Sequence, residues 1–318
     1  MSRPSQADLV EALLRDFAGR QPFRAGSFIV TVYGDAVAPR GGRLSLASLL
    51  ALMAEVGANE SLVRTAVSRL SADGWLSGER RGRRSFYRLT DSGSRRFEEA
   101  TRRIYFGPPT EWDGAWQVVL IPGGAGAARE VLRKELRWLG FGQAAPGVLI
   151  HPMPDRDALA ALLSSPEAAD TAILVSGGPD AAPSGKAVEL LVAEGWTLEA
   201  LAEGYRRFLE RFAPLAESLA SRLELDPLQC LLLRLLLIHE YRKVILRDPM
   251  LPLDLLPRAW PGQEAQQLCR GIYAAVVGGA EAWVSETLRR DDGALPPPGP
   301  DFWARFGGLP QKARAAAG

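Results

Sequence analysis

The sequence predicts an α+β protein with more than one compact unit, and three observations support this prediction. The chain has 318 residues, more than the roughly 100 to 200 of one typical domain. Apolar residues recur at helical spacing near the N-terminus, and a hairpin rich in arginine follows. Farther along, short apolar strands alternate with helices, and helical spacing dominates from residue 197. We therefore expect an N-terminal winged helix-turn-helix, a middle ferredoxin-like α+β domain and a C-terminal helical domain.

The bulk composition favours a cytoplasmic globular protein. Hydrophobic residues make up 47% of the chain and charged residues 24%, which is typical of globular domains. The polar start does not resemble an export signal, and the longest apolar run, 231–238, is far shorter than the ~20 residues of a membrane span. The chain has two cysteines and two histidines, too few for a zinc-type cluster, so we expect no metal.

Charge is distributed unevenly along the chain. Residues 1–110 contain 17 arginines against 11 acidic residues, a net charge of +6, and the remainder sums to −5. This asymmetry is typical of a nucleic-acid-binding module joined to a neutral or acidic sensor. The alternative is a solvated surface rich in arginine.

The first part of the chain has the helix order of a helix-turn-helix. Helical spacing predicts helices over 8–17, 28–37 and 46–56, with a loop over 39–43. Asn59 is a good N-cap and Asp73-Gly74 is a break, so a further helix is expected over 60–72. One face of this helix is apolar. The other presents hydroxyls and guanidiniums that could reach phosphates and base edges: Ser61, Arg64, Thr65, Ser68 and Arg69. The alternative is a plain solvent-exposed face.

A basic hairpin follows this helix. Strands are expected over 75–79 and 85–89, joined by a turn around Gly82 that holds Arg80, Arg81, Arg83 and Arg84. A hairpin in this position is the wing of a winged helix, and its arginines could contact DNA along the backbone or in a minor groove. A merely soluble turn is the alternative. Thr90 is expected to cap another helix.

The later domains follow from changes of pattern. After a linker near 107–115, we expect strands over 116–122, 147–151 and 171–176, with helices over 127–139 and 155–163. The predicted division is a winged-helix domain over 1–106, a ferredoxin-like domain over 112–196, a helical domain over 197–290 and a flexible tail over 291–318.

One helix after Asp226-Pro227 places polar groups on its apolar face. His239 and Arg242 share that face with a row of leucines. A buried guanidinium needs an anionic partner, which could be Asp248 or the phosphates of a ligand. The candidate effector-binding residues are His239, Tyr241, Arg242, Arg247 and Trp260. The alternatives are an internal ion pair that holds the turn at Asp248, and a tryptophan packed on the core.

The chain contains an ordered series of distinctive segments: VTVYGD, NESLVRTAVSRLSADGWL, GRRSFYRLT, RRIY, WDGAW, LGFG, LIHEYRK, RDPMLPLDLLP and AWPG. Together these segments resemble the PaaX family, the repressors of phenylacetic acid degradation operons. They extend from Phe28 to Trp260, nearly the whole chain. The resemblance implies a homodimer that binds double-stranded operator DNA, a middle domain similar in fold to CRISPR-associated endoribonucleases, and an acyl-CoA effector, usually phenylacetyl-CoA.

That middle domain raises an enzymatic alternative. A metal-dependent nuclease would need an acidic residue at the end of the strand 116–122; residues 118–122 supply none, and Asp113 precedes the strand. The glycines at 123, 124 and 126 lack the spacing of a phosphate-binding loop. We expect no catalytic residues and no cofactor. A nuclease, or an acyl-CoA-processing enzyme such as a thioesterase, using the middle or C-terminal domain remains the competing hypothesis.

Overall fold

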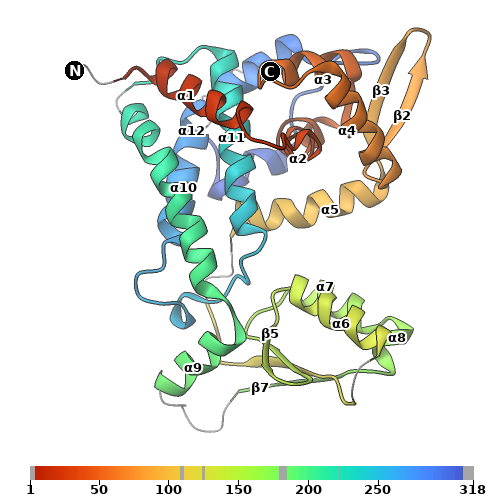
Figure 1. Cartoon of the computed structure of the whole chain (residues 1–318), viewed down its shortest axis with the longest axis vertical. Helices are drawn as coiled ribbons and strands as arrows, with labels where there is room; N and C mark the ends of the chain where they lie inside the picture. The colour runs from red at the N-terminus through yellow and green to blue at the C-terminus, as the bar shows by residue number, and fades with distance from the viewer. Residues whose placement is uncertain (1–3, 108–110, 124–125, 179–184, 221, 311–318) are drawn as a thin grey trace. The chain divides into compact units, whose positions relative to one another are not determined.

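The computed structural model describes residues 4–107, 111–123, 126–178, 185–220 and 222–310 (Figure 1). The chain divides into two compact units. Unit 1 comprises Met1–Phe106, Arg207–Lys243 and Gln263–Gly318, and unit 2 comprises Gly107–Arg206 and Val244–Gly262. Among the described residues, no helix has both the length and the apolar character needed to cross a membrane.

The N-terminal part of unit 1 is a winged helix, as predicted. After α1 (Gln6–Ala18), the helix α2 (Ala25–Val32) continues into the π-helical turn η1 (Tyr33–Val37) and the short η2 (Ala38–Arg40). Then follow β1 (Arg43–Ser45), α3 (Leu46–Ala54), α4 (Glu60–Ala72), β2 (Leu76–Arg81) and β3 (Arg84–Leu89), and the strands form an antiparallel sheet in the order β1-β3-β2. Helix, strand, two helices and a hairpin in this order define the fold.

Local chemistry accounts for the helix starts. The Ser45 hydroxyl accepts a hydrogen bond from the Ser48 amide, and the Asn59 side chain accepts one from the Leu62 amide at 2.9 Å. Both satisfy amides that the first turn of a helix leaves unpaired. The sequence predicted the cap at Asn59 but placed a loop where β1 begins. A three-residue strand is too short for periodicity to reveal, and β1 exists because it pairs with β3.

The C-terminal helices complete unit 1 together with α5 (Asp91–Thr101) and η3 (Arg102–Phe106). These C-terminal helices are α10 (Leu198–Leu219) and α11 (Pro227–Ile245), most of each belonging to unit 1, and α12 (Gly262–Thr287). The segment expected to be a flexible tail is folded as far as residue 310. It contains β9 (Gly293–Ala294), which pairs with β8 (Arg289–Arg290), then α13 (Pro300–Trp303) and η5 (Arg305–Gly307). Residues 311–318 lie outside the described part.

Unit 2 has the predicted ferredoxin-like topology. Its order is β4 (Trp116–Leu120), α6 (Ala127–Trp138), β5 (Gly142–Ala145), β6 (Val148–His151), α7 (Arg156–Leu163), α8 (Pro166–Ala169), β7 (Ile173–Gly177) and α9 (Gly185–Gly195). The antiparallel sheet has the order β5-β6-β4-β7, so the first and third strands are central. The segment around η4 (Leu253–Leu255), expected in a separate helical domain, belongs to this unit.

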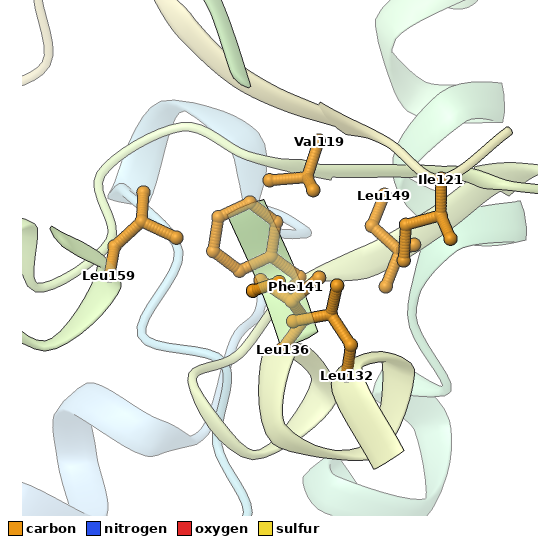
Figure 2. Close-up of a cluster of buried hydrophobic side chains, with 8 residues drawn as sticks. Val119, Ile121, Leu132, Leu136, Phe141, Leu149 and Leu159 are labelled. Carbon is orange, nitrogen blue, oxygen red and sulfur yellow. The ribbon is translucent and has the colours of Figure 1, made fainter. Parts of the chain in front are cut away.

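The core of unit 2 lies between one face of the sheet and α6 and α7. Val119 and Leu149 point from the sheet, Leu136 from α6 and Leu159 from α7, around the ring of Phe141 (Figure 2). Alternate strand residues and an i, i+4 helix pair supply this cluster, which is the burial pattern expected for a sheet covered by helices.

Candidate nucleic-acid interface

Helix α4 separates its apolar and polar residues as the sequence predicted. Val63, Ala66, Val67 and Leu70 are buried, and the helix packs against α2. The five predicted contact residues are all exposed: Ser61, Arg64, Thr65, Ser68 and Arg69. The buried face fixes the helix in the domain, so the polar side chains on the other face are held in a defined register for an external partner.

Two of these side chains have partners within the helix. Arg64 donates from Nε to Glu60 Oε1 at 2.7 Å, and Thr65 donates its hydroxyl to the Ser61 carbonyl at 2.9 Å. The Arg64–Glu60 pair is exposed on both sides, and such pairs contribute only ~0 to 1 kcal/mol. Arg64 can therefore exchange this carboxylate for a phosphate or a base edge at little cost.

The wing is a narrow hairpin that projects beyond α3 and α4 (Figure 1). Arg81 pairs with Arg84, so only Gly82 and Arg83 form the turn. Gly82 has a φ of 61°, a left-handed conformation that glycine adopts without strain. The predicted five-residue turn is thus wrong: Arg80, Arg81 and Arg84 lie in strands, because the ladder continues to the tip. All four arginines are exposed.

The wing arginines differ in their partners. Arg81 donates from Nε to Glu79 Oε1 at 2.7 Å and forms an ion pair of 2.6 Å with Asp291, in the β8–β9 turn. The hydrogen bond from Arg81, together with the positive charges of Arg43 and Arg81, holds the pKa of Glu79 below its usual value. Arg80 donates to the Gly82 carbonyl at 3.1 Å. Arg81 is therefore already paired with two carboxylates, Glu79 and Asp291. Arg83 lies in the turn at the tip of the hairpin.

The C-terminal β8–β9 hairpin lies beside β1, at the edge of the β1-β3-β2 sheet (the wing sheet) opposite β2. Asp291 also forms an ion pair with Arg43 at 3.2 Å, and the Arg289 amide donates to the Ser48 hydroxyl at 3.0 Å. Asp292, the next residue, pairs with Arg290 instead. Residues near the end of the chain therefore stabilise β1 and the start of α3.

A buried ionic network joins the winged helix to the C-terminal helices. Asp35 accepts hydrogen bonds from the hydroxyls of Tyr105 and Tyr273, at 2.8 and 2.9 Å, and from Arg305 at 3.2 Å. Its second oxygen lies 2.8 Å from Arg234 Nε. These groups are at most 3% exposed, so each charge depends on its partners.

The network continues through Glu281. Glu281 binds Arg234 at 2.6 Å and Arg40 at 2.5 Å, and Arg40 donates to the Pro296 carbonyl at 2.8 Å. Three guanidiniums thus surround two carboxylates, and carbonyl oxygens satisfy further donors. Sequence reasoning missed this cluster. The available signals were Arg234 inside an apolar run and Asp35 on an otherwise apolar helix face.

Two of the candidate effector residues are packed inside unit 1. His239 is 2% exposed, its Nδ1 is hydrogen-bonded to the Thr31 hydroxyl at 2.9 Å, and its ring contacts Phe17 and Phe28. Arg242 donates to both the carbonyl and the hydroxyl of Ser27 at 2.7 Å. Within the described residues, the hydrogen-bond partners of Arg242 are neutral oxygens of α2, and Glu240 acts on its charge without a hydrogen bond.

The other three candidates have surroundings of their own. Tyr241 is 1% exposed and packs against Phe208. Arg247 is exposed, and Trp260 is half-buried with its ring edge-on to Tyr205 at 5.8 Å. Asp248, the predicted partner of Arg242, accepts hydrogen bonds from the Tyr205 hydroxyl and the Met250 amide, each at 2.7 Å. Whether any of the five contacts an effector stays a prediction.

The first strand of unit 2 presents no carboxylate. β4 consists of Trp, Gln, Val, Val and Leu, and Asp113 before it accepts a hydrogen bond from the Ala115 amide at 2.9 Å. Across the part of the chain that the structure describes, no three His, Cys, Asp or Glu side chains are grouped as metal ligands.

A winged helix with an exposed polar helix face and an arginine-rich wing is the arrangement typical of DNA-binding transcriptional regulators. Three family models match the chain: PaaX-like protein over residues 24–93, the PaaX protein central Cas2-like domain over 109–188, and the PaaX-like protein C-terminal domain over 196–286. The chain belongs to the PaaX family of transcriptional repressors.

The proteins similar to the chain include a curated repressor and a solved structure. The Transcriptional repressor PaaX of Escherichia coli (strain K12) is 40% identical over 289 residues, which covers 91% of this chain and 92% of the relative. A solved structure, the uncharacterized protein Rv0674 from Mycobacterium tuberculosis, is 24% identical, with a TM-score of 0.48, and the match covers 74% of this chain and 89% of that one.

Proposed function

We propose that this protein is a homodimeric repressor that binds double-stranded operator DNA of a phenylacetate catabolic operon. An aryl-CoA or acyl-CoA effector, such as phenylacetyl-CoA, releases it. The proposed compartment is the cytoplasm, where the operator is. No catalytic step, metal or cofactor is part of this proposal.

The observation that supports DNA binding is the exposed face of α4 beside the wing. Ser61, Arg64, Thr65, Ser68 and Arg69 are all exposed on a helix whose opposite face is buried. Such a helix fits the major groove, which is wide enough to admit one, and the neighbouring wing offers Arg83 and Arg84 to the backbone. Two copies related by a two-fold axis would bind two half-sites about one helical turn apart.

The test is a titration of the protein into labelled DNA from upstream of its own operon, by mobility shift and anisotropy. We expect a shift at submicromolar protein that phenylacetyl-CoA reverses, because specific affinities are ~10⁻⁸ to 10⁻¹¹ M. CoA alone is the control. DNA that does not shift would contradict the proposal.

The same reactions separate the repressor from the enzymatic alternative. A nuclease would shorten the labelled DNA when a divalent cation is added, and a thioesterase would release free CoA thiol from phenylacetyl-CoA. We expect intact DNA and intact thioester after release. Sedimentation of the protein–DNA complex then tests for two protomers per operator.

A further inference from the structure

A cavity of about 440 Å³ lies in unit 1, at the base of the wing. Its lining comes from the 34–42 segment, from Leu89 and α5, and from the C-terminal segment 299–305. The volume is within the ~300 to 1,000 Å³ typical of small-molecule sites. The C-terminal segment 299–305 completes a lining that the winged helix and α5 supply only in part.

The lining is apolar with two kinds of polar group. Leu89, Phe97 and Phe302 supply apolar walls and are less than 10% exposed. Ser94 and Thr101 place hydroxyls on the same face of α5 as Phe97, because these residues are spaced by three and four positions. Aromatic and aliphatic walls with a few hydroxyl donors suit an aromatic group that has a carbonyl.

The charges of the lining disfavour an anion. Glu98 and Asp301 are exposed carboxylates of the lining. Arg305 also lines the cavity, but its guanidinium already donates to Asp35 and to the Gly34 carbonyl. A free carboxylate at this place would meet two like charges and a cation whose charge is already compensated. An uncharged thioester would not.

The cavity touches one end of the wing sheet, where β3 ends and β1 begins. The Leu89 amide, at the end of β3, donates to the Gly42 carbonyl just before β1, at 3.0 Å. Both residues line the cavity. Gly34 leaves no room for a side chain, because a Cβ there would lie 2.8 Å from the Phe97 ring. A ligand here therefore contacts the base of the wing directly, and α5 that follows it.

We infer that this cavity binds the uncharged aromatic acyl end of the CoA thioester, with the nucleotide part outside, and that Glu98 and Asp301 exclude the free acid. This inference rests on the proposed function. Because the ligand contacts the wing base, its occupancy shifts the wing between a DNA-bound and a released arrangement, and DNA must weaken the ligand reciprocally.

The first test fills the cavity in the full-length protein. Thr101→Phe and Ser94→Phe place a ring in the space, and Arg95→Phe adds the same ring at an exposed position of α5 outside the lining. Calorimetry with phenylacetyl-CoA should show affinity at least ~10-fold weaker for the two filling variants and unchanged for Arg95→Phe. Thermal unfolding verifies that each variant is folded. Wild-type affinity in both filling variants would overturn the assignment of the acyl group to this cavity.

A second test uses protection of a thiol, so it does not depend on tolerance of a large ring. Both native cysteines, Cys230 and Cys269, are 0% exposed. A maleimide should therefore label only the thiol introduced by Thr101→Cys, and phenylacetyl-CoA should slow that labelling at least ~10-fold. Labelling of Arg95→Cys should not slow. Equal labelling rates of Thr101→Cys with and without the thioester would overturn the inference.

The third test concerns the charge filter. Phenylacetate should not bind the wild type, and Glu98→Gln with Asp301→Asn should raise its affinity ~10-fold or more, while CoA alone gains nothing. An unchanged phenylacetate affinity would overturn the inference that Glu98 and Asp301 exclude the free acid. If the wild type binds no thioester at all, the proposed function itself fails. If it binds the thioester but the Thr101→Cys thiol is unprotected, only the cavity assignment fails.

Discussion

Arg81 on the wing and Asp291 in the β8–β9 turn form an ion pair of 2.6 Å, although 210 residues separate them. In the described structure the wing hairpin is therefore held, on one side, by a carboxylate from near the end of the chain. On the proposed function, this carboxylate would compete with DNA phosphates for Arg81.

Asp291→Asn should strengthen binding to all DNA sequences, because it removes one of the two carboxylates paired with Arg81 and leaves that part of the guanidinium for a phosphate. The salt dependence should steepen by about one counterion. The matched control is Asp292→Asn. This variant removes the same charge from the next residue, whose carboxylate is paired with Arg290 instead of Arg81. Equal effects of the two variants would show that net charge, not the Arg81 contact, matters.

Arg83→Ala and Arg84→Ala should each weaken operator and random DNA alike and lower the salt slope by about one. Both side chains are exposed at the tip of the hairpin. Affinity for phenylacetyl-CoA should not change. A salt slope that stays the same in the double variant would show that the wing does not contact DNA.

Arg64→Ala should reduce specificity more than general affinity. If Arg64 leaves Glu60 to read a base, the variant loses ~1 to 3 kcal/mol on operator DNA and less on random DNA. Anisotropy titrations on both DNAs measure the difference. Equal losses on the two DNAs would reassign Arg64 to a phosphate.

Asp35→Asn should lower the free energy of unfolding by ~3 to 5 kcal/mol, because it leaves the buried Arg305 without its carboxylate and leaves Arg234 with Glu281 alone. Denaturant unfolding measures this. Asp16→Asn removes the exposed pairs with Arg20 and Arg211 and should change the free energy by at most ~1 kcal/mol. Similar values for both would indicate that the network contributes no more than a surface pair.

His239 should make stability depend on pH. Burial lowers its pKa to about 2, with smaller contributions from Lys243, Arg242 and Arg20. The unfolded histidine titrates near 6.5, so below that pH the unfolded state binds more protons and stability falls, by up to ~1.4 kcal/mol per pH unit. His239→Gln should show a smaller loss between pH 7.5 and 5, measured by denaturant unfolding. An identical slope in wild type and variant would exclude His239 as the cause.

Local patterns in the sequence predicted most of the elements, and long-range pairing explains the rest. The bounds of α4 and its N-cap at Asn59 follow from neighbouring residues, and so does the division of its faces. β1 and β5 are three and four residues long, and they are strands only because β3 and β6 pair with them. The wing turn is shorter than predicted for the same reason.

The polar residues of the C-terminal helices show the limit most clearly. The sequence indicated that His239 and Arg242 lie on an apolar face, and both are buried or nearly so. It did not indicate their partners, because Thr31 and Ser27 lie about two hundred residues earlier. The same holds for Arg305, placed in an expected flexible tail, which is 270 residues from Asp35.

The separation of Arg305 from Asp35 also has a consequence for synthesis on the ribosome. Chains emerge from the N-terminus, and domains generally fold as units during synthesis. The winged helix is synthesised first, but the Asp35 carboxylate does not gain all its ion-pair and hydrogen-bond partners until Arg234, Tyr273 and finally Arg305 have emerged. A nascent chain therefore cannot complete the core of unit 1 early, and a truncated product that stops before Arg305 would lack one of the three cations of the network.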